Sequence, residues 1–408
     1  MEKLYLRHDE YLSGISVDFV RDMMNIINWD SRLICIKGPK GVGKSTLLLQ
    51  RIKLNFEEGD RHVLYCSADT SYFSTHTLID TADMFVKLGG THLFIDEIHK
   101  YEGWSSEIKE IYDLYKNLHV VISGSSLLRL NDGNADLSRR LLSYEMHGLS
   151  FREYLWFETG ERFDVITLEE LLENPTKLCN EVKKKCHPLE HFKKYLKYGY
   201  YPFYYEGKMG YYPKVENVIN YIIDDELPKL RMVEHGNTRK LKSLIKVISE
   251  TVPFEVNIDK ISKSVGIQRA TTLTYFKHME EARLLMRIFG DIDKMTDLQK
   301  PDKLLLDNSN LLYVISDKIP EIGTARETFF CNQLRNSKHR VEYGGLKTGD
   351  FRIDGKYTIE VGGENKGFGQ IDPNEMKTGY VAADDIDNAV FHKLPLWAFG
   401  FLYELVGS

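Results

Sequence analysis

A glycine-rich stretch near the N-terminus has the residues and spacing of a phosphate-binding loop. Residues 38–46 read GPKGVGKST, which fits the pattern G-x-x-x-x-G-K-[ST]. They follow the apolar run LICIK and precede the helical pattern STLLLQRIKLNFEE. Such glycines let successive backbone N–H groups point at phosphate oxygens, and the helix N-terminus adds positive partial charge. The stretch predicts an ATP site; the alternative is an ordinary glycine-rich turn.

Each residue of this loop has an expected role. Lys44 would reach the β- and γ-phosphates of ATP, and Ser45 would bind Mg²⁺. The remaining contacts to the nucleotide are expected from Gly38, Pro39, Lys40, Gly41, Val42, Gly43 and Thr46.

An acidic pair ends a second apolar run, HLFIDEI at 92–98. We expect Asp96 to hold Mg²⁺ through water and Glu97 to orient or deprotonate the attacking water. A helix cap or a solvated acid is the alternative for an acidic pair taken alone. Together with the phosphate-binding loop, the pair predicts ATP hydrolysis.

Polar residues later in the chain could complete this site. Ser123 and Ser125 end the run HVVISGS and could contact the γ-phosphate or the water, unless they only form a serine-rich turn. Arg139 and Arg140 would be misplaced to act on the ATP site of their own chain. They would suit an arginine finger offered to a neighbouring subunit of a homo-oligomer, and the alternative is a solvated surface pair.

Length and composition limit the class of protein. The chain has 408 residues, 42% hydrophobic and 28% charged, with a net charge of −6, so we expect two or three globular domains. The start MEKLYLRHDE is charged throughout and does not read as a signal peptide, and no apolar run is long enough to span a bilayer. Five cysteines without C-x-x-C spacing favour reduced thiols and a cytoplasmic protein.

Short apolar runs alternate with helical patterns over residues 32–148. The runs LICIK, HVLYCSA, HLFIDEI, HVVISGS and LSYEMHG lack polar alternation, as in a parallel sheet covered on both faces. We therefore predict an α/β fold with the ATP site at the sheet edge. The predicted parts are an ATPase core over 1–150, a helical segment over 151–235 (the lid of the resemblance described next), a winged helix over 236–295 and a mixed α/β domain over 296–408, with strands at VEYGG, DFRID, YTIEVG and LWAFGFLYEL.

These residues resemble a group of prokaryotic AAA-type P-loop ATPases. The shared features are GPKGVGKST, LFIDEIH, SGSS, LSRR, GLSFREYL and GYYPF. The resemblance implies the sheet order 5-1-4-3-2, a helical lid, a winged helix, a C-terminal domain resembling restriction endonucleases, and a nucleotide between subunits. It places the finger at Arg140, but Arg139 stands where the group usually has glycine, which leaves open which of the two acts.

The segment IDKISKSVG followed by IQRATTLTYFKHMEEARLL has the length and glycine turn of a helix-turn-helix. Its second helix would present polar residues to a DNA groove: Arg269, Thr271, Thr272, Thr274, Lys277 and His278. A winged helix can also serve only for packing, and the net charge of −6 means that any DNA contact needs a local basic patch.

A metal-dependent nuclease pattern, D…E-x-K, is present in altered form near the C-terminus. Asp350 and Glu360 could meet at one sheet edge, and Glu327 could add a third metal ligand. Gly362 takes the place of the lysine, and the loop GGENKG could bring Lys366 back, with help from Gln370. We expect a retained nuclease architecture with weak or absent cleavage; an active nuclease is the alternative.

Two functions follow from these features. The first is an Mg²⁺-dependent ATPase that works as a nucleotide-driven machine or switch on DNA, without a membrane partner. The second is a nucleotide-dependent signalling or protein-interaction switch, in which the nuclease-like domain is inert.

Overall fold

A computed structural model describes residues 1–128, 137, 139–250, 256–290, 296, 299–345 and 349–403 of the chain. The chain divides into two compact units, Met1–His147 and Gly148–Ser408. The predicted boundary after residue 150 lies beside this division. Those after 235 and 295 lie inside the second unit and stay predictions.

The first unit is built on a five-stranded parallel sheet. Its strands are β1 (Leu33–Gly38), β2 (Val63–Ser67), β3 (His92–Asp96), β4 (His119–Ser125) and β5 (Leu142–Glu145). They lie in the order β2-β3-β4-β1-β5, and every neighbouring pair is parallel. This confirms the predicted order 5-1-4-3-2. Parallel strands end at the same edge of a sheet, so the loops after β1, β3 and β4 can build one site.

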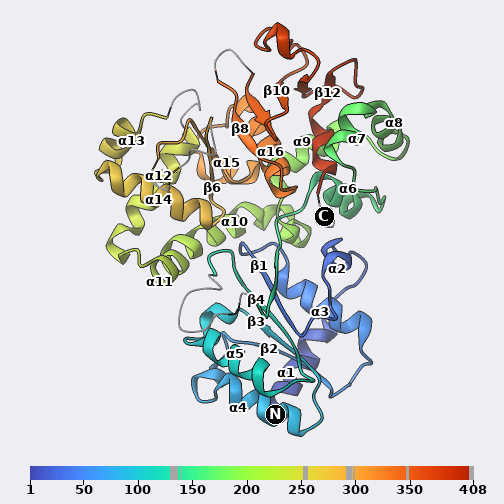
Figure 1. Cartoon of the computed structure of the whole chain (residues 1–408), viewed down its shortest axis with the longest axis vertical. Helices are drawn as coiled ribbons and strands as arrows, with labels where there is room; N and C mark the ends of the chain where they lie inside the picture. The colour runs from blue at the N-terminus through green and yellow to red at the C-terminus, as the bar shows by residue number, and fades with distance from the viewer. Residues whose placement is uncertain are drawn as a thin grey trace. The chain divides into compact units, whose positions relative to one another are not determined.

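Helices cover both faces of this sheet (Figure 1). They are α1 (Glu2–Ser13), α2 (Met23–Ile26), α3 (Lys44–Asn55), α4 (Leu78–Lys87) and α5 (Trp104–Leu114), with short 3₁₀ turns at Ser71–Ser74 and Ile98–Lys100. Leu33 and Cys35 of β1 face the core made with α4 and α5, whereas Ile34 and Ile36 face the core made with α2 and α3. The two buried faces explain why the strands lack polar alternation.

The second unit begins with a helical region. Its helices are α6 (Phe151–Thr159), α7 (Leu168–Glu173), α8 (Pro175–Lys185), α9 (Pro188–Tyr198), α10 (Tyr211–Tyr221) and α11 (Leu227–Arg231), with 3₁₀ turns at Pro202–Glu206, Lys208–Gly210 and His235–Asn237 and a π turn at Ile222–Glu226. Ser150 and Glu153 cap α6 reciprocally, as Thr167 and Glu170 cap α7. These capping boxes set where the two helices begin.

Three helices and a hairpin follow. They are α12 (Thr238–Glu250), α13 (Ile258–Val265), α14 (Arg269–Glu281), β6 (Leu285–Ile288) and β7 (Lys303–Leu306). The strands β6 and β7 are antiparallel, so this hairpin takes its strands from both sides of the predicted boundary after 295. Gly266 ends α13 in the left-handed region, at φ 70°, and turns the chain into α14.

The C-terminal part is a mixed sheet with helices. Its elements are α15 (Ser309–Ile315), α16 (Ile322–Asn336), β8 (Val341–Tyr343), β9 (Phe351–Ile353), β10 (Tyr357–Gly362), β11 (Gly379–Ala383) and β12 (Lys393–Pro395), with 3₁₀ turns at Pro373–Glu375 and Leu396–Phe401. The order is β12-β11-β10-β9-β8, parallel from β10 to β12 and antiparallel from β8 to β10. The mixed α/β character is confirmed, and a nuclease fold stays a prediction.

The strand predicted at LWAFGFLYEL is wrong for residues 396–403, and residues 404 and 405 lie outside the described part of the chain. Residues Leu396–Phe401 form a 3₁₀ helix, η8, whose residues are all buried. Gly400 packs so closely that a Cβ there would lie 2.4 Å from the Cβ of Phe151. A fully apolar run has no periodicity that separates a buried strand from a buried helix, so only packing decided between them. In the part of the chain that the structure describes, no helix combines the length and apolarity needed to cross a membrane.

Candidate active site

The phosphate-binding loop connects β1 to α3 and depends on its glycines. Gly41 and Gly43 have φ angles of 87° and 97°, which residues with a Cβ rarely adopt. At Gly38 a Cβ would lie 2.2 Å from the carbonyl oxygen of Met146. The chain therefore needs glycine at these places in order to curl into α3, whose first helical residue is Lys44.

The Lys44 side chain is buried and folds back into its own loop. Its Nζ donates to the carbonyl oxygens of Gly38, at 2.8 Å, and Pro39, at 2.9 Å. Ser45 and Thr46 follow in the first turn of α3, and Ser45 is half-buried. The ammonium thus lies inside the curve of the loop, where ATP phosphates would bind in place of the carbonyls.

Asp96 is buried at the end of β3 and held by two neighbouring strands. Its Oδ2 accepts a hydrogen bond of 2.7 Å from the Tyr65 hydroxyl of β2. Its Oδ1 accepts from the Ser123 hydroxyl of β4 and, at 3.0 Å, from the backbone N–H of Glu97. These contacts fix the carboxylate, and carboxylate and hydroxyl oxygens such as those of Asp96 and Ser45 are the ligands that Mg²⁺ prefers.

Glu97 lies beyond the strand end in a strained backbone conformation. Its φ of 53° is in the left-handed region, which is unusual for a residue with a side chain and frequent at active sites. Burial raises the pKa of its carboxyl above the ordinary value, and the positive charge of Lys44 opposes this shift. A raised pKa makes the carboxylate a better proton acceptor.

His99 lies beside the same carboxylate. Its Nε2 lies 3.4 Å from Oε2 of Glu97, and its Nδ1 accepts from the backbone N–H of Ser125 at 3.3 Å. Burial, followed by the charge of Lys100, lowers the pKa of His99 to about 3. The imidazole is therefore neutral at pH 7.

The structure thus brings Lys44, Asp96, Glu97 and Ser123 to one edge of the sheet, and Ser125 joins them through His99. Sequence reasoning missed Tyr65, His99 and Arg21. The Arg21 guanidinium is buried and donates to the carbonyl oxygens of Val42, at 3.3 Å, and His147. The one available signal for Tyr65 was a tyrosine within an apolar strand, because a buried phenol needs a hydrogen-bond partner.

The two arginines lie after β4, outside this group. The guanidinium of Arg140 pairs with Asp113 of α5, its Nε 3.2 Å from Oδ1 and its Nη2 3.3 Å from Oδ2. Arg139 is exposed. Arg140 must leave Asp113 if it is to reach the nucleotide of another subunit.

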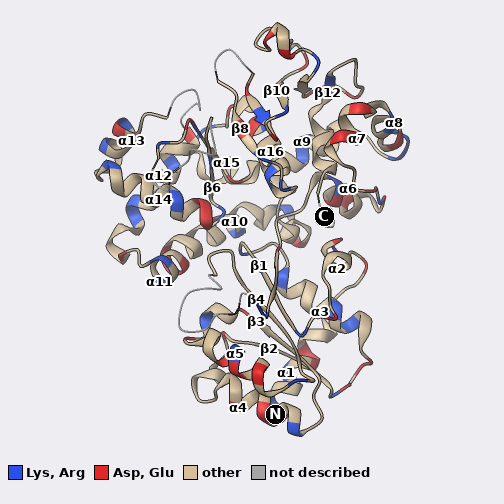
Figure 2. Cartoon of the chain, in the orientation of Figure 1, with Lys and Arg blue, Asp and Glu red and all other residues tan. Residues whose placement is uncertain are grey.

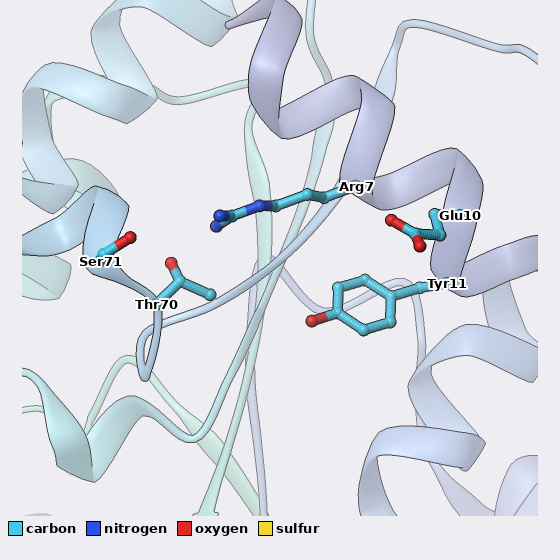
Figure 3. Close-up of a pocket in the computed structure, with 5 residues that line it drawn as sticks. All are labelled: Arg7, Glu10, Tyr11, Thr70 and Ser71. Atoms are coloured by element: carbon cyan, nitrogen blue, oxygen red, sulfur yellow. The ribbon is translucent and has the colours of Figure 1, made fainter.

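A separate cavity of about 450 Å³ lies beside α1 (Figure 3). Arg7, Glu10 and Tyr11 of α1 line it, with Thr70 and Ser71 after β2. The rings of Tyr11 and Tyr65 meet edge to face, with centroids 5.4 Å apart. Tyr11 of the cavity wall therefore contacts Tyr65, whose hydroxyl donates to Asp96.

In the second unit, Lys366 folds back to the two acids of the altered nuclease pattern. Its Nζ lies 2.6 Å from Oε2 of Glu360 and 3.5 Å from Oδ2 of Asp350, and it donates to Oε1 of Gln370 at 2.9 Å. Asp350 also accepts from the backbone N–H of Val361 at 2.9 Å. We call Asp350, Glu360, Lys366 and Gln370 the lysine cluster.

Gly362 makes room for the Lys366 side chain to fold back toward Glu360. A Cβ at Gly362 would lie 2.7 Å from Cβ and Cγ of Lys366, so the stem of the lysine occupies the space of a side chain at 362. Glu360 is fully buried, and this burial raises its pKa to about 7 although the ion pair with Lys366 opposes the shift. Burial lowers the pKa of Lys366, but the bond to Glu360 and the charge of Asp350 raise it above its ordinary value.

Glu327 binds a different lysine. Its Oε2 lies 2.6 Å from Nζ of Lys303 on β7, and burial raises the pKa of its carboxyl. Lys303 was missed because it looks like an ordinary basic residue before an apolar run. Among the residues that the structure describes, no three His, Cys, Asp or Glu side chains are arranged to hold a metal ion.

The second helix of the predicted helix-turn-helix exposes only part of its polar residues. Arg269 is exposed and pairs with Asp259 at 3.2 Å; Thr271, Thr274, Lys277 and His278 are half-buried. Thr272 is fully buried, and its hydroxyl bonds that of Ser262 at 2.8 Å. The prediction that Thr272 faces a groove is therefore wrong, because its position on α14 points toward α13.

Part of the chain matches a known protein family. Residues 30–155 match a family described as AAA domain. The uncharacterized protein MJ1637 of Methanocaldococcus jannaschii is 25% identical over 319 residues, which are 73% of this chain and 66% of that protein. The chain therefore spans slightly less than two thirds of this relative.

Solved structures are similar at low sequence identity. A RuvB variant of Thermotoga maritima is 14% identical, with 70% of this chain and 89% of that chain covered at a TM-score of 0.26. AMPPCP-bound DnaA of Aquifex aeolicus is 16% identical, with 68% and 87% covered at a TM-score of 0.25. The family match, the phosphate-binding loop and the parallel sheet together show that residues 30–155 form an AAA domain of the P-loop ATPase class.

Proposed function

We propose that the first unit hydrolyses ATP in the presence of Mg²⁺. The observation that carries this proposal is the convergence of the phosphate-binding loop with Asp96, Glu97 and Ser123 at the ends of β1, β3 and β4. AAA domains bind ATP with Mg²⁺ in general, and the oxygen ligands of this site fit that ion.

The residues divide the chemistry between them. Backbone N–H groups of the loop and the N-terminus of α3 bind the phosphates, and Lys44 moves from its carbonyls to the β- and γ-phosphate oxygens. Glu97 accepts a proton from the attacking water, and Ser123 orients the γ-phosphate or that water. Mg²⁺, held by Ser45 and through water by Asp96, would neutralise charge on the phosphate oxygens.

Two substitutions test this proposal. Lys44→Ala should abolish ATP binding measured by calorimetry, whereas Lys53→Ala, which removes a lysine from the exposed side of the same helix, should leave it intact. Glu97→Gln should keep ATP affinity and reduce turnover by about 10²-fold or more, since it removes the proton acceptor. Unchanged affinity in Lys44→Ala, or native turnover in Glu97→Gln, would refute the proposal.

We further propose that ATP turnover drives work on DNA through the winged helix. The support is the arrangement of α12, α13 and α14 with the β6–β7 hairpin, and the basic residues along these helices (Figure 2). Lys260, Lys263 and Arg269 are exposed around the turn between α13 and α14. Exposed cations of this kind bind phosphates and release counterions.

The test is salt-dependent DNA binding coupled to ATP turnover. The double substitution Lys260→Glu and Lys263→Glu should weaken DNA binding and lower the slope of log affinity against log salt. The matched control changes two other exposed lysines of this unit, Lys318→Glu and Lys377→Glu, and should bind as the native chain does. No DNA-stimulated turnover in the native protein would favour the alternative function.

That alternative is a protein-interaction or signalling switch with an inert nuclease-like domain. The lysine cluster supports an inert nuclease-like domain, because Lys366 places an ammonium between the carboxylates where a metal cation would bind. A cleavage assay with Mg²⁺ or Mn²⁺ should show no cutting. Robust cutting that is lost in Asp350→Ala would instead establish a working nuclease.

A further inference from the structure

We propose that His99 is a positioning residue, which holds the carboxylate of Glu97 in the orientation that accepts a proton from the attacking water. The inference rests on the proposed ATP hydrolysis and adds a residue to it. It comes from the placement of the two ring nitrogens of one buried side chain. Nδ1 accepts a hydrogen bond from the end of β4, and Nε2 lies near the carboxylate of Glu97, where a small turn of that carboxylate would complete a hydrogen bond.

The first contact sets the tautomer. The backbone N–H of Ser125 donates to Nδ1 of His99 at 3.3 Å, so Nδ1 carries a lone pair and the ring proton is on Nε2. Nε2 lies 3.4 Å from Oε2 of Glu97, a close approach that does not have the geometry of a hydrogen bond in this structure. Such contacts are often long before substrate binds and shorten in the complex.

The second point is that His99 acts as a neutral donor. Its side chain is only 3% exposed, and a second ring proton would remove the acceptor that Ser125 uses. The charged groups that act on Glu97 are Lys44, Lys40, Lys100 and Asp96.

Both contacts come from the local fold. The left-handed backbone at Glu97 starts the 3₁₀ turn Ile98–Lys100 and brings His99 back toward β4. The end of β4 then reaches the acidic pair twice: Ser123 bonds Asp96 directly, and Ser125 reaches Glu97 through His99. A displacement at the end of β4 would therefore turn the carboxylate of Glu97.

Amide side chains separate the two contacts. In His99→Gln the amide nitrogen reaches the place of Nε2 and can donate to Glu97, but nothing accepts from Ser125. In His99→Asn the shorter side chain can accept from Ser125 and cannot reach Glu97. His99→Leu keeps the apolar volume and removes both contacts.

We expect His99→Gln to retain kcat within about 3-fold. His99→Asn and His99→Leu should lower kcat by about 10- to 100-fold, because a misplaced Glu97 would lose part of the rate contribution that a general base makes. KM for ATP should stay within about 2-fold, because only the reacting carboxylate is disturbed. In a Glu97→Gln background, measured by single turnover, His99→Asn should cause no further loss, as expected for residues that act as one unit.

Native turnover in His99→Asn, equal losses in His99→Gln and His99→Leu, or a full additional loss in the Glu97→Gln background would overturn the inference. Calorimetric ATP affinity and thermal unfolding show that each variant is folded. These outcomes differ from failure of the proposed function, in which Glu97→Gln itself would turn over at the native rate.

Discussion

At the scale of the residue, buried acids in this protein are held by polar groups from neighbouring elements. Asp96 takes hydrogen bonds from β2 and β4, and Glu360 lies against a lysine that returns from a following loop. A buried carboxylate is costly without such partners. Removing one partner should therefore change the acid's function before it changes the fold.

Tyr65→Phe should raise the Mg²⁺ concentration needed for half-maximal ATP turnover by about 10- to 150-fold. The substitution removes the 2.7 Å bond to Asp96 and keeps the ring, and a hydrogen bond to a charged group is worth about 1.5–3 kcal/mol. Tyr5→Phe is the matched control, since its hydroxyl donates to the Arg61 carbonyl in the same unit. Equal Mg²⁺ dependence in the two variants would contradict a role for Tyr65.

At the scale of the element, polar contacts between secondary structures decide which residues remain for binding. Thr272 joins α14 to α13 through Ser262, whereas Lys260 and Lys263 stay exposed. The lysine cluster likewise joins β10 to the loop that follows it.

Thr272→Val should lower the free energy of unfolding by about 1 kcal/mol and leave DNA affinity unchanged. The side chains have similar volume, but valine leaves the buried Ser262 hydroxyl without this bond. Chemical denaturation and a binding titration measure the two effects. A loss of DNA affinity without a loss of stability would contradict this assignment and indicate that Thr272 contacts DNA.

Glu360 should make stability fall with rising pH. Its pKa is about 7 in the folded chain and near the ordinary 4.5 when unfolded, so between these values the folded state binds more protons. Its stabilising contribution is complete below pH 4.5 and is lost as the pH rises through 7. Unfolding free energies of the native chain and Glu360→Gln, measured from pH 4.5 to 7.5, should therefore diverge at the higher pH; parallel curves would contradict the burial argument.

At the scale of the whole molecule, we propose that a second subunit completes the ATP site. Arg140 is paired with Asp113 in the single chain, and Arg139 is exposed. An arginine supplied by a second subunit would make turnover depend on protein concentration.

Mixing a chain that carries Arg139→Ala and Arg140→Ala with a Glu97→Gln chain should restore part of the turnover. Each inactive chain would supply what the other lacks, one an intact Glu97 and the other intact arginines. The matched control mixes the Glu97→Gln chain with Lys44→Ala, Arg139→Ala and Arg140→Ala combined, which should restore nothing. A monomer by light scattering, with turnover per chain independent of concentration, would exclude action in trans.

The sequence by itself determined the parts of this protein that depend on neighbours along the chain. The phosphate-binding loop, its strand and its helix depend on glycine spacing and local periodicity, and the strands of the parallel sheet show as short apolar runs. The sheet order came from the resemblance to AAA-type ATPases, and the structure agrees with it. Only the tertiary structure decided which side chains of different segments meet: Tyr65 and Asp96, Lys366 and Glu360, Thr272 and Ser262. It also made residues Leu396–Phe401 a 3₁₀ helix. The physical reason is that burial and packing between distant segments assign a polar partner to each buried group, and no spacing along the chain encodes that choice.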